Sequence, residues 1–199
     1  INMSSLCLLF KVHQPYQLKR YTDQEITVSH CYEDAAADER SINILSDECY
    51  LPVNEIILSL IAKHNGRFKV SYSISGTALE LFQKYRPDTI DSFQRLVATG
   101  CVEILAETYY HSLSFLYSKN EFQRQVKKHH NLVEKLFEIS PGVFRNTELI
   151  YNNELAKIIA DMGYNGILWV KQMFADVITE FGMVDILINN AGLQQETFY

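Results

Sequence analysis

The stretch best suited to chemistry is the segment 143–153, VFRNTELIYNN, in which a carboxylate stands among basic, amide and aromatic side chains. A Pro-Gly turn precedes it, two apolar residues begin it as a short buried strand, and Asn152 or Asn153 suits the N-cap of a following helix. Glu148 is therefore predicted in a strand-to-helix loop, at the edge of the sheet where α/β proteins place their chemistry. Its carboxylate is a candidate nucleophile or acid/base; the alternative is a loop glutamate that only pairs with Arg145.

Three further stretches place polar side chains where predicted strands end. They are His13-Gln14 after the strand 6–12, residues 73–76 after the strand 67–73, and residues 107–111 after the strand 101–106. Because the carboxyl ends of parallel strands meet at one edge of a sheet, all four stretches are expected on one face. His13 is a candidate for binding substrate or, equally, a capped histidine held by a backbone carbonyl.

Two acidic residues belong to the third of these strands. Glu103 alternates with apolar neighbours and so points to the opposite face of its strand, where it is either part of a structural ion pair or a buried site residue. Glu107 and His111 flank two tyrosines in a loop that suits stacking and hydrogen bonding to sugar rings, or is simply solvated. Residues 127–130, KKHH, are typical of a helix face in water, with His130 at the edge of the core.

Strands and helices are predicted to alternate along the chain. Apolar stripes and capping signals predict helices over 51–62, 78–84, 87–98, 118–139 and 155–161. Strands are predicted over 6–12, 67–73, 101–106, 143–144 and 167–170. Residues 16–48 are polar and are predicted as a long loop with a short helix over 33–45. The predicted class is α/β with a parallel sheet.

Length and composition restrict the class of protein further. The 199 residues suit one domain or a piece of a larger barrel, and 47% hydrophobic residues are enough for a core. A net charge of −6 argues against nucleic acid or an anionic membrane as partner. The four cysteines show no CxxC spacing, which favours reduced thiols in a cytoplasmic protein over disulfides or a zinc site. No apolar run approaches membrane-spanning length.

Four segments together resemble glycoside hydrolase family 57, which contains α-amylases and 4-α-glucanotransferases. They are residues 10–15 (FKVHQP), 100–107 (GCVEILAE), 109–113 (YYHSL) and 144–149 (FRNTEL). The resemblance covers roughly residues 3–169. It implies a partial (β/α)7-type barrel with parallel strands, active-site loops at the strand C-terminal ends, a retaining mechanism, and neither metal nor cofactor in the chemistry.

The same resemblance implies roles for individual residues. Glu148 falls where the family has its nucleophile, His13 and Glu103 fall in its first and second substrate-site regions, and His111 falls near the same sugar subsite. We therefore expect the four side chains to converge on one cleft that binds an α-glucan or maltooligosaccharide. The family's general acid is an Asp far downstream, and the sequence ends at Tyr199 before that point. The chain is thus expected to be truncated and at best feebly active.

The last thirty residues follow a different pattern. Residues 174–182 and the Asn-Asn-Ala-Gly motif at 189–192 resemble part of a short-chain dehydrogenase. A glycine-rich loop and a Tyr-x-x-x-Lys pair are missing, so no nicotinamide site is expected. We predict a helix over 171–181 and a strand over 184–188 that extend the sheet, with Asn189 and Asn190 serving only a turn. The predicted division is therefore 1–169, the barrel part, and 170–199, the tail.

Three functions follow, in order of preference. The first is a retaining glycosidase or glucanotransferase on α-glucans, with Glu148 forming a glycosyl-enzyme. A second carboxyl is required, and Glu103 or Glu107 could approach. The second function is a non-catalytic barrel fragment that binds glucan weakly. The third, an NAD(P)-dependent oxidoreductase, depends only on the tail.

Overall fold

Parallel strands form the centre of the molecule. A computed structural model describes residues 7–20, 22, 30–168 and 187–191. Its strands are β1 (Cys7–Val12), β2 (Val70–Ile74), β3 (Val102–Leu105), β4 (Val143–Arg145), β5 (Gly166–Leu168) and β6 (Leu187–Ala191). One sheet has the order β3-β2-β1-β6 and the other consists of β4 and β5, and neighbouring strands in both sheets run parallel.

A parallel bridge joins the two sheets. Ala106 pairs with Phe144, and its amide and carbonyl bond to the backbone on either side, at 2.9 Å to the Val143 carbonyl and 2.7 Å from the Arg145 amide. Strands β1 to β5 therefore lie side by side in chain order, as barrel strands do. The prediction of an α/β fold with parallel barrel-type strands is confirmed.

Helices connect the strands. They are α1 (Ala35–Leu45), the π-helix η1 (Ser46–Tyr50), α2 (Leu51–Lys63), α3 (Gly76–Tyr85), α4 (Pro87–Ala98), α5 (Ser114–Tyr117), α6 (Lys119–Phe137), the 3-10 turn η2 (Thr147–Leu149) and α7 (Asn153–Asp161). The side chains of Ser118 and Asn152 accept hydrogen bonds from the amides of Glu121 and Leu155, which confirms the predicted starts of α6 and α7. The short helix predicted over 33–45 is confirmed as α1. The end of the predicted loop, residues 46–48, is helical instead, because η1 joins α1 to α2 without a break.

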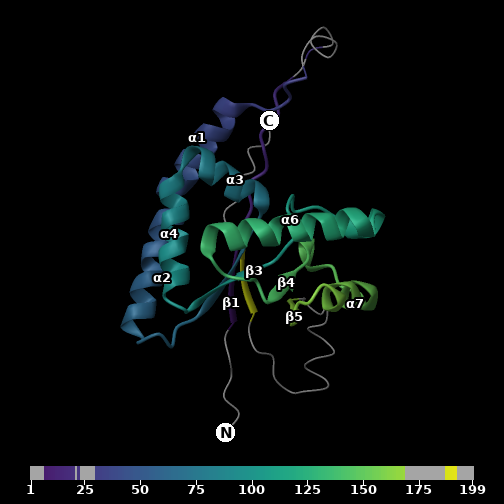
Figure 1. The fold of residues 1–199 in the computed structure, drawn as a ribbon. Coiled ribbons are helices and arrows are strands. Elements are labelled where there is room, and N and C mark those ends of the chain that lie inside the picture. Colours follow the sequence, from purple (N-terminus) through teal and green to yellow (C-terminus); the bar gives the residue numbers. More distant parts are fainter. Residues whose placement is uncertain (1–6, 21, 23–29, 169–186, 192–199) are drawn as a thin grey trace.

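The helices cover the outer face of the sheet. Figure 1 shows α2 and α4 side by side along one flank, with α6 crossing in front of β3 and β4. Alternate residues of β2 and β3, including Tyr72, Ile74 and Ile104, are buried under these helices in a core with Phe82 and Phe93. A second core forms where α6 and α7 meet β4, and it contains Phe115, Phe122, Phe144, Leu155 and Ile159.

The other residues of each strand form what we call the inner face. Strand register places Leu9 beside Ser71 and Lys11 beside Ser73, and Ser71 beside Glu103. Because side chains alternate along a strand, these residues all project away from the helices. The inner face is the one on which barrel enzymes gather their site residues at the carboxyl ends.

The C-terminal strand departs from one prediction. β6 pairs with β1, with Asn189 opposite Leu9 and Asn190 opposite Phe10. The expectation that both asparagines serve only a turn is therefore wrong, because their backbones belong to the sheet. The predicted helix 171–181 lies outside the described residues.

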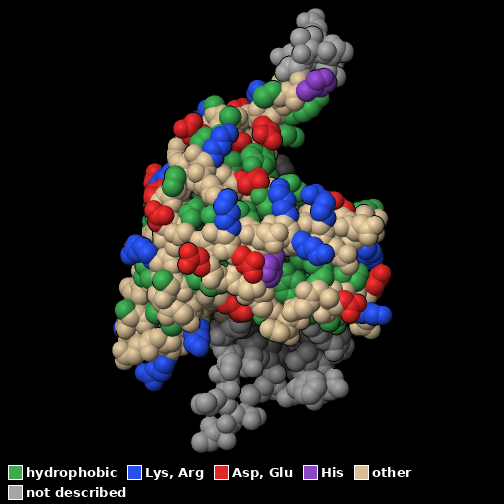
Figure 2. Space-filling view, in the orientation of Figure 1, with side chains coloured by type: hydrophobic (Ala, Val, Ile, Leu, Met, Phe, Trp, Pro, Cys, Tyr) green, Lys and Arg blue, Asp and Glu red, His purple; other side chains and the backbone are tan. Residues whose placement is uncertain are grey.

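The surface carries both signs of charge. Figure 2 shows Lys and Arg side chains interspersed with Asp and Glu over the face that bears α4 and α6. In the part of the chain that the structure describes, no helix has the length and apolar character needed to cross a membrane.

Candidate active site

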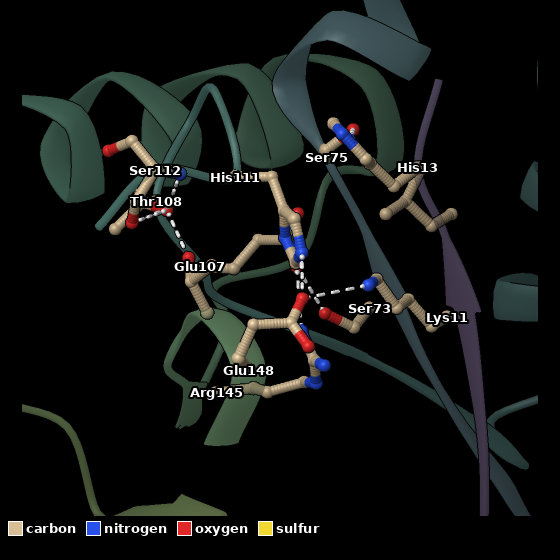
Figure 3. Close-up of polar contacts among 12 residues, drawn as sticks. Lys11, His13, Ser73, Ser75, Glu107, Thr108, His111, Ser112, Arg145 and Glu148 are labelled. Atoms are coloured by element: carbon tan, nitrogen blue, oxygen red, sulfur yellow. Dashed lines mark hydrogen bonds and ion pairs between the residues drawn. The ribbon is translucent and has the colours of Figure 1, made fainter. Parts of the chain in front are cut away.

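The four polar stretches meet at the carboxyl ends of β1 to β4. Figure 3 shows side chains from each of them arranged around the Glu148 carboxylate. Lys11 and His13 come from β1 and its end, Ser73 and Ser75 from β2, Glu107 and His111 from the segment after β3, and Arg145 and Glu148 from β4 and the turn after it. The expectation of convergence is met for His13, His111 and Glu148.

Glu148 presents a carboxylate to solvent and to two nitrogens. Its side chain is 63% exposed, and Oε1 lies 3.1 Å from His111 Nε2 and 3.3 Å from Lys11 Nζ. The hydrogen bond from His111, followed by the Lys11 charge, holds the pKa of Glu148 below its usual range. The group is therefore ionised at neutral pH and accessible, as a nucleophile must be.

The backbone at this turn is strained. Glu148, Leu149 and His111 have φ of +51°, +56° and +52°, in the left-handed region that side chains with a Cβ rarely adopt. Non-glycine residues in this region cost on the order of 1–3 kcal/mol each and gather at functional sites. Asn65 and Glu138, which share this conformation, lie just beyond α2 and α6, where it is an ordinary way to end a helix.

Two histidine rings lie side by side next to the carboxylate. The His13 and His111 centroids are 4.5 Å apart, and His13 Nδ1 lies 2.8 Å from Ser75 Oγ. Burial, followed by the Lys11 charge, lowers the pKa of both imidazoles to about 4. Both are neutral at pH 7, so His111 donates its Nε2 proton to Glu148.

A second carboxyl lies buried in the same cluster. Glu107 is 1% exposed; its Oε2 accepts the Ser73 hydroxyl and lies 3.6 Å from Arg145 Nη1. Burial raises the pKa of Glu107 to about 7, although the Ser73 hydrogen bond and the Arg145 charge act the other way. Its backbone amide donates to Nδ1 of His129 at 3.3 Å.

Helix α6 contributes one histidine to this arrangement, and it is not the one predicted at the core edge. His129 is fully buried, and its Nε2 donates to the Ile74 carbonyl at 2.7 Å. His130 is partly exposed and lies 3.0 Å from the Tyr164 hydroxyl and 3.1 Å from Glu134. The imidazole of His129 thus ties the end of β2 to the segment after β3.

Glu103 does not join the cluster. It lies near the amino end of β3, is exposed, and has Ser71 Oγ at 3.5 Å. It borders an open groove of about 510 Å³. It lies four positions before Glu107, about 13 Å along a strand. The expected convergence is therefore wrong for Glu103, and we assign it no part in the site.

Sequence reasoning missed Lys11 as a member of the cluster, whereas Ser73 and Arg145 belong to stretches that it placed at this edge of the sheet. Two-residue alternation could have found Lys11, because His13 lies two positions further on and so shares its face. The burial of Glu107 and Arg145 depends on contacts between distant segments. Within residues 7–20, 22, 30–168 and 187–191, no three His, Cys, Asp or Glu side chains are grouped as a metal site would require.

Comparison with known proteins places this geometry in a family. The model of "Glycosyl hydrolase family 57" matches residues 7–174. A protein of Methanocaldococcus jannaschii described as a "Putative alpha-amylase" is 41% identical over 160 residues, which cover 79% of this chain and 34% of that protein. The chain thus spans about a third of the length of this relative.

Solved structures share the fold at low sequence identity. The 4-alpha-glucanotransferase of Thermococcus litoralis superposes with a TM-score of 0.63 at 19% identity, over 82% of this chain and 22% of that enzyme. The alpha-amylase AmyC of Thermotoga maritima gives 0.58 at 14% identity, over 83% and 39%. With a family model that matches most of its residues, this chain belongs to glycosyl hydrolase family 57.

Proposed function

We propose that the chain carries the nucleophile-bearing part of a retaining enzyme that acts on α-glucans. The observation that supports this most is Glu148: an exposed, ionised carboxylate at the carboxyl end of β4, with its Oε1 held by His111 and Lys11. Family membership and relatives described as an alpha-amylase and a 4-alpha-glucanotransferase indicate the class of substrate.

In the proposed reaction Glu148 attacks the anomeric carbon of a glucosyl unit. The bond from that carbon to the leaving oxygen breaks as the glycosyl ester forms, and water or an acceptor hydroxyl later cleaves the ester. His13, whose ring lies 4.5 Å from that of His111, would form a hydrogen bond to a hydroxyl of the same sugar through its Nε2. The single proton of neutral His111 is already donated to Glu148. Lys11 would keep the carboxylate ionised between turnovers.

The general acid belongs elsewhere. A retaining pair of carboxyls lies about 5 Å apart on either side of the scissile bond, and both must reach the substrate. Glu107 is 1% exposed and bonded to Ser73, so a leaving oxygen cannot reach it. We place the acid outside the described residues and expect the 199-residue chain to hydrolyse natural glucans feebly.

The other two functions have less support. A barrel fragment that only binds glucan would not need a strained backbone at an ionised carboxylate. The oxidoreductase depended only on the tail, and the sequence lacks the glycine-rich loop and the Tyr-x-x-x-Lys pair that a nicotinamide site requires. The thiols Cys49 and Cys101 are outside any disulfide, and on that ground we keep the proposal of a cytoplasmic protein.

A test must not require a general acid. A 5-fluoro-α-maltosyl fluoride meets this condition, because fluoride leaves without protonation and the ring fluorine slows hydrolysis of the ester. We expect one equivalent of glycosyl ester on the 199-residue chain, mapped to Glu148 by peptide mass spectrometry. The β-configured fluoride should not react, since the attack inverts an α bond.

Matched variants complete the test. Glu148→Gln should abolish labelling, a loss of at least about 10³-fold for a removed nucleophile. Glu154→Gln is the control, because its side chain is nearby in sequence and 61% exposed, close to the exposure of Glu148. Labelling on any residue other than Glu148, or labelling that survives Glu148→Gln, would contradict the assignment.

A further inference from the structure

A buried ion pair lies beside the proposed nucleophile, and the proposed chemistry does not use it. Glu107 and Arg145 are each 1% exposed, with Nη1 and Oε2 3.6 Å apart. Among the described residues, no other carboxylate lies within 4.0 Å of this guanidinium. Since a guanidinium out of water is costly without a counterion, Glu107 is the group that lets Arg145 remain there.

Four segments hold the pair in place. Ser73 of β2 donates its hydroxyl to Glu107, and His129 of α6 accepts the Glu107 amide. His111 presents its Nδ1 edge 4.0 Å from Glu107 Oε2, while its Nε2 edge bonds to Glu148. The fourth segment is the end of β4, which carries Arg145 three residues before Glu148.

Several atoms of this group have no hydrogen-bond partner. Within the described residues they are Glu107 Oε1, His111 Nδ1, and Nε and Nη1 of Arg145, all buried. Charge, and not a set of directional bonds, therefore fixes the guanidinium. Figure 3 shows the Arg145 side chain next to the Glu148 carboxylate. Burial lowers the pKa of Arg145, and the charges of Glu107 and then Glu148 act against this lowering.

We propose that Glu107 is a positioning residue for Glu148: it neutralises Arg145 and so leaves the Glu148 carboxylate with His111 and Lys11. The inference rests on the proposed function of Glu148. Among the described residues, Glu148 is the other carboxylate whose charge acts on this guanidinium, so it is the one that Arg145 attracts when the Glu107 charge is removed. The nucleophile then turns inward, away from the anomeric carbon that it must attack.

The test compares Glu107→Gln with Glu103→Gln. Both remove a carboxylate from the inner face of the same segment, but only Glu107 contacts Arg145. With the 5-fluoro-α-maltosyl fluoride at pH 8, where Glu107 is ionised, we expect esterification in Glu107→Gln to be about 10²-fold slower at saturating probe, the cost of a misplaced reacting group. The half-saturating concentration should change little, and Glu103→Gln should react like the original chain.

A second readout does not depend on reactivity. In ¹⁵N NMR spectra of histidine-labelled chain, the Nε2 signal of His111 reports its hydrogen bond to Glu148. We expect this signal to shift in Glu107→Gln and to stay in place in Glu103→Gln. If the original chain takes no label, the proposed function fails, and the NMR comparison still decides the role of Glu107.

A rescue separates positioning from a general loss of packing. In Glu107→Gln/Arg145→Gln the attracting guanidinium is gone, so labelling and the His111 signal should return toward those of the original chain. If Glu107→Gln does not fold, Ser73→Ala against Ser71→Ala provides the same comparison, with slower labelling and a shifted signal expected only for Ser73→Ala. Equal labelling rates and an unchanged His111 signal in either comparison would overturn the proposal.

Discussion

Glu103 and Glu107 lie on one face of one segment, four residues apart, and have opposite surroundings. Glu103 is exposed beside an open groove, with only a 3.5 Å contact from Ser71 Oγ. Glu107 is 1% exposed and lies among a guanidinium, a hydroxyl and two imidazoles. Both residues are glutamates on the same face of the strand, so their different positions along the barrel axis decide which carboxyl is buried and paired.

The largest test of this contrast is stability. At pH 8, above the pKa of about 7 of Glu107, we expect Glu107→Gln to lower the free energy of unfolding by about 3 kcal/mol or more, because it leaves the buried Arg145 without a counterion. Glu103→Gln should change it by no more than about 0.5 kcal/mol, as exposed substitutions do. Urea unfolding followed by circular dichroism measures both. Equal losses of free energy of unfolding in the two variants would contradict the difference in surroundings between Glu103, beside the groove, and Glu107, in the site.

A pH series sharpens the contrast. Burial lowers the pKa of His13, His111 and His129 to about 4. Their contribution to the free energy of unfolding is therefore fully present above pH 6.5 and is lost as the pH falls toward 4. Burial raises the pKa of Glu107 to about 7. The contribution of its protonated form to the free energy of unfolding is therefore fully present below pH 4.5 and is lost as the pH rises through 7.

Between about pH 4.5 and 6.5, the three imidazoles make the protein more stable as the pH rises, whereas the Glu107 carboxyl makes it less stable. Unfolding near pH 5.5 should take up about two protons, which makes stability rise by roughly 2–3 kcal/mol per pH unit. Glu107→Gln removes the opposing group, so its stability should rise more steeply, with about three protons taken up. Urea midpoints measured from pH 5 to 6 give both slopes, and a shallower slope in the variant would contradict the pKa assigned to Glu107.

The end of the sheet that carries the site and the end beside the groove also differ in how closely side chains pack against the backbone. A Cβ on Gly76, at the site end, would lie 2.5 Å from the Tyr109 ring, whereas one on Gly142, beside the groove, would lie 3.3 Å from the Asn165 side-chain amide. We expect Gly76→Ala to cost about 1–3 kcal/mol, since the ring must move. Gly142→Ala should cost less than 1 kcal/mol, because an amide at the end of a flexible side chain can yield. Thermal melts of the two variants make the comparison.

The smallest effect is expected from the two serines of β2. Ser73→Ala removes a buried donor to Glu107 and should cost about 1–2 kcal/mol. Ser71→Ala removes a 3.5 Å contact with an exposed carboxylate and should cost no more than about 0.5 kcal/mol. If the two variants unfold at the same urea concentration, the Ser73 hydroxyl contributes no more than Ser71 does.

The sequence was sufficient for the local features of this fold. The caps Ser118 and Asn152 and the apolar stripes gave helices α6 and α7 close to their observed bounds. The alternation of strands with helices predicted a parallel sheet. The polar residues that follow the strands predicted the sheet edge at which His13, His111 and Glu148 meet. Each of these depends on neighbours within a few residues.

Features that depend on distant contacts could not be predicted in this way. Whether Glu103 or Glu107 is buried depends on how many strands and helices surround each level of the inner face. The burial of His129 in preference to His130 depends on the rotation of α6 against β2 and β3. The pairing of Asn189 with Leu9 joins the two ends of the chain, and no local pattern specifies it.

Ser75 links a histidine of the site to the fraying of a helix. Its hydroxyl oxygen accepts the amide proton of Ala78 at the start of α3, and the same oxygen lies 2.8 Å from His13 Nδ1. We expect an opening of the first turn of α3 that displaces Ser75 to release His13 as well. Deuterium uptake at the Ala78 amide therefore counts how often His13 is released, with no substrate present.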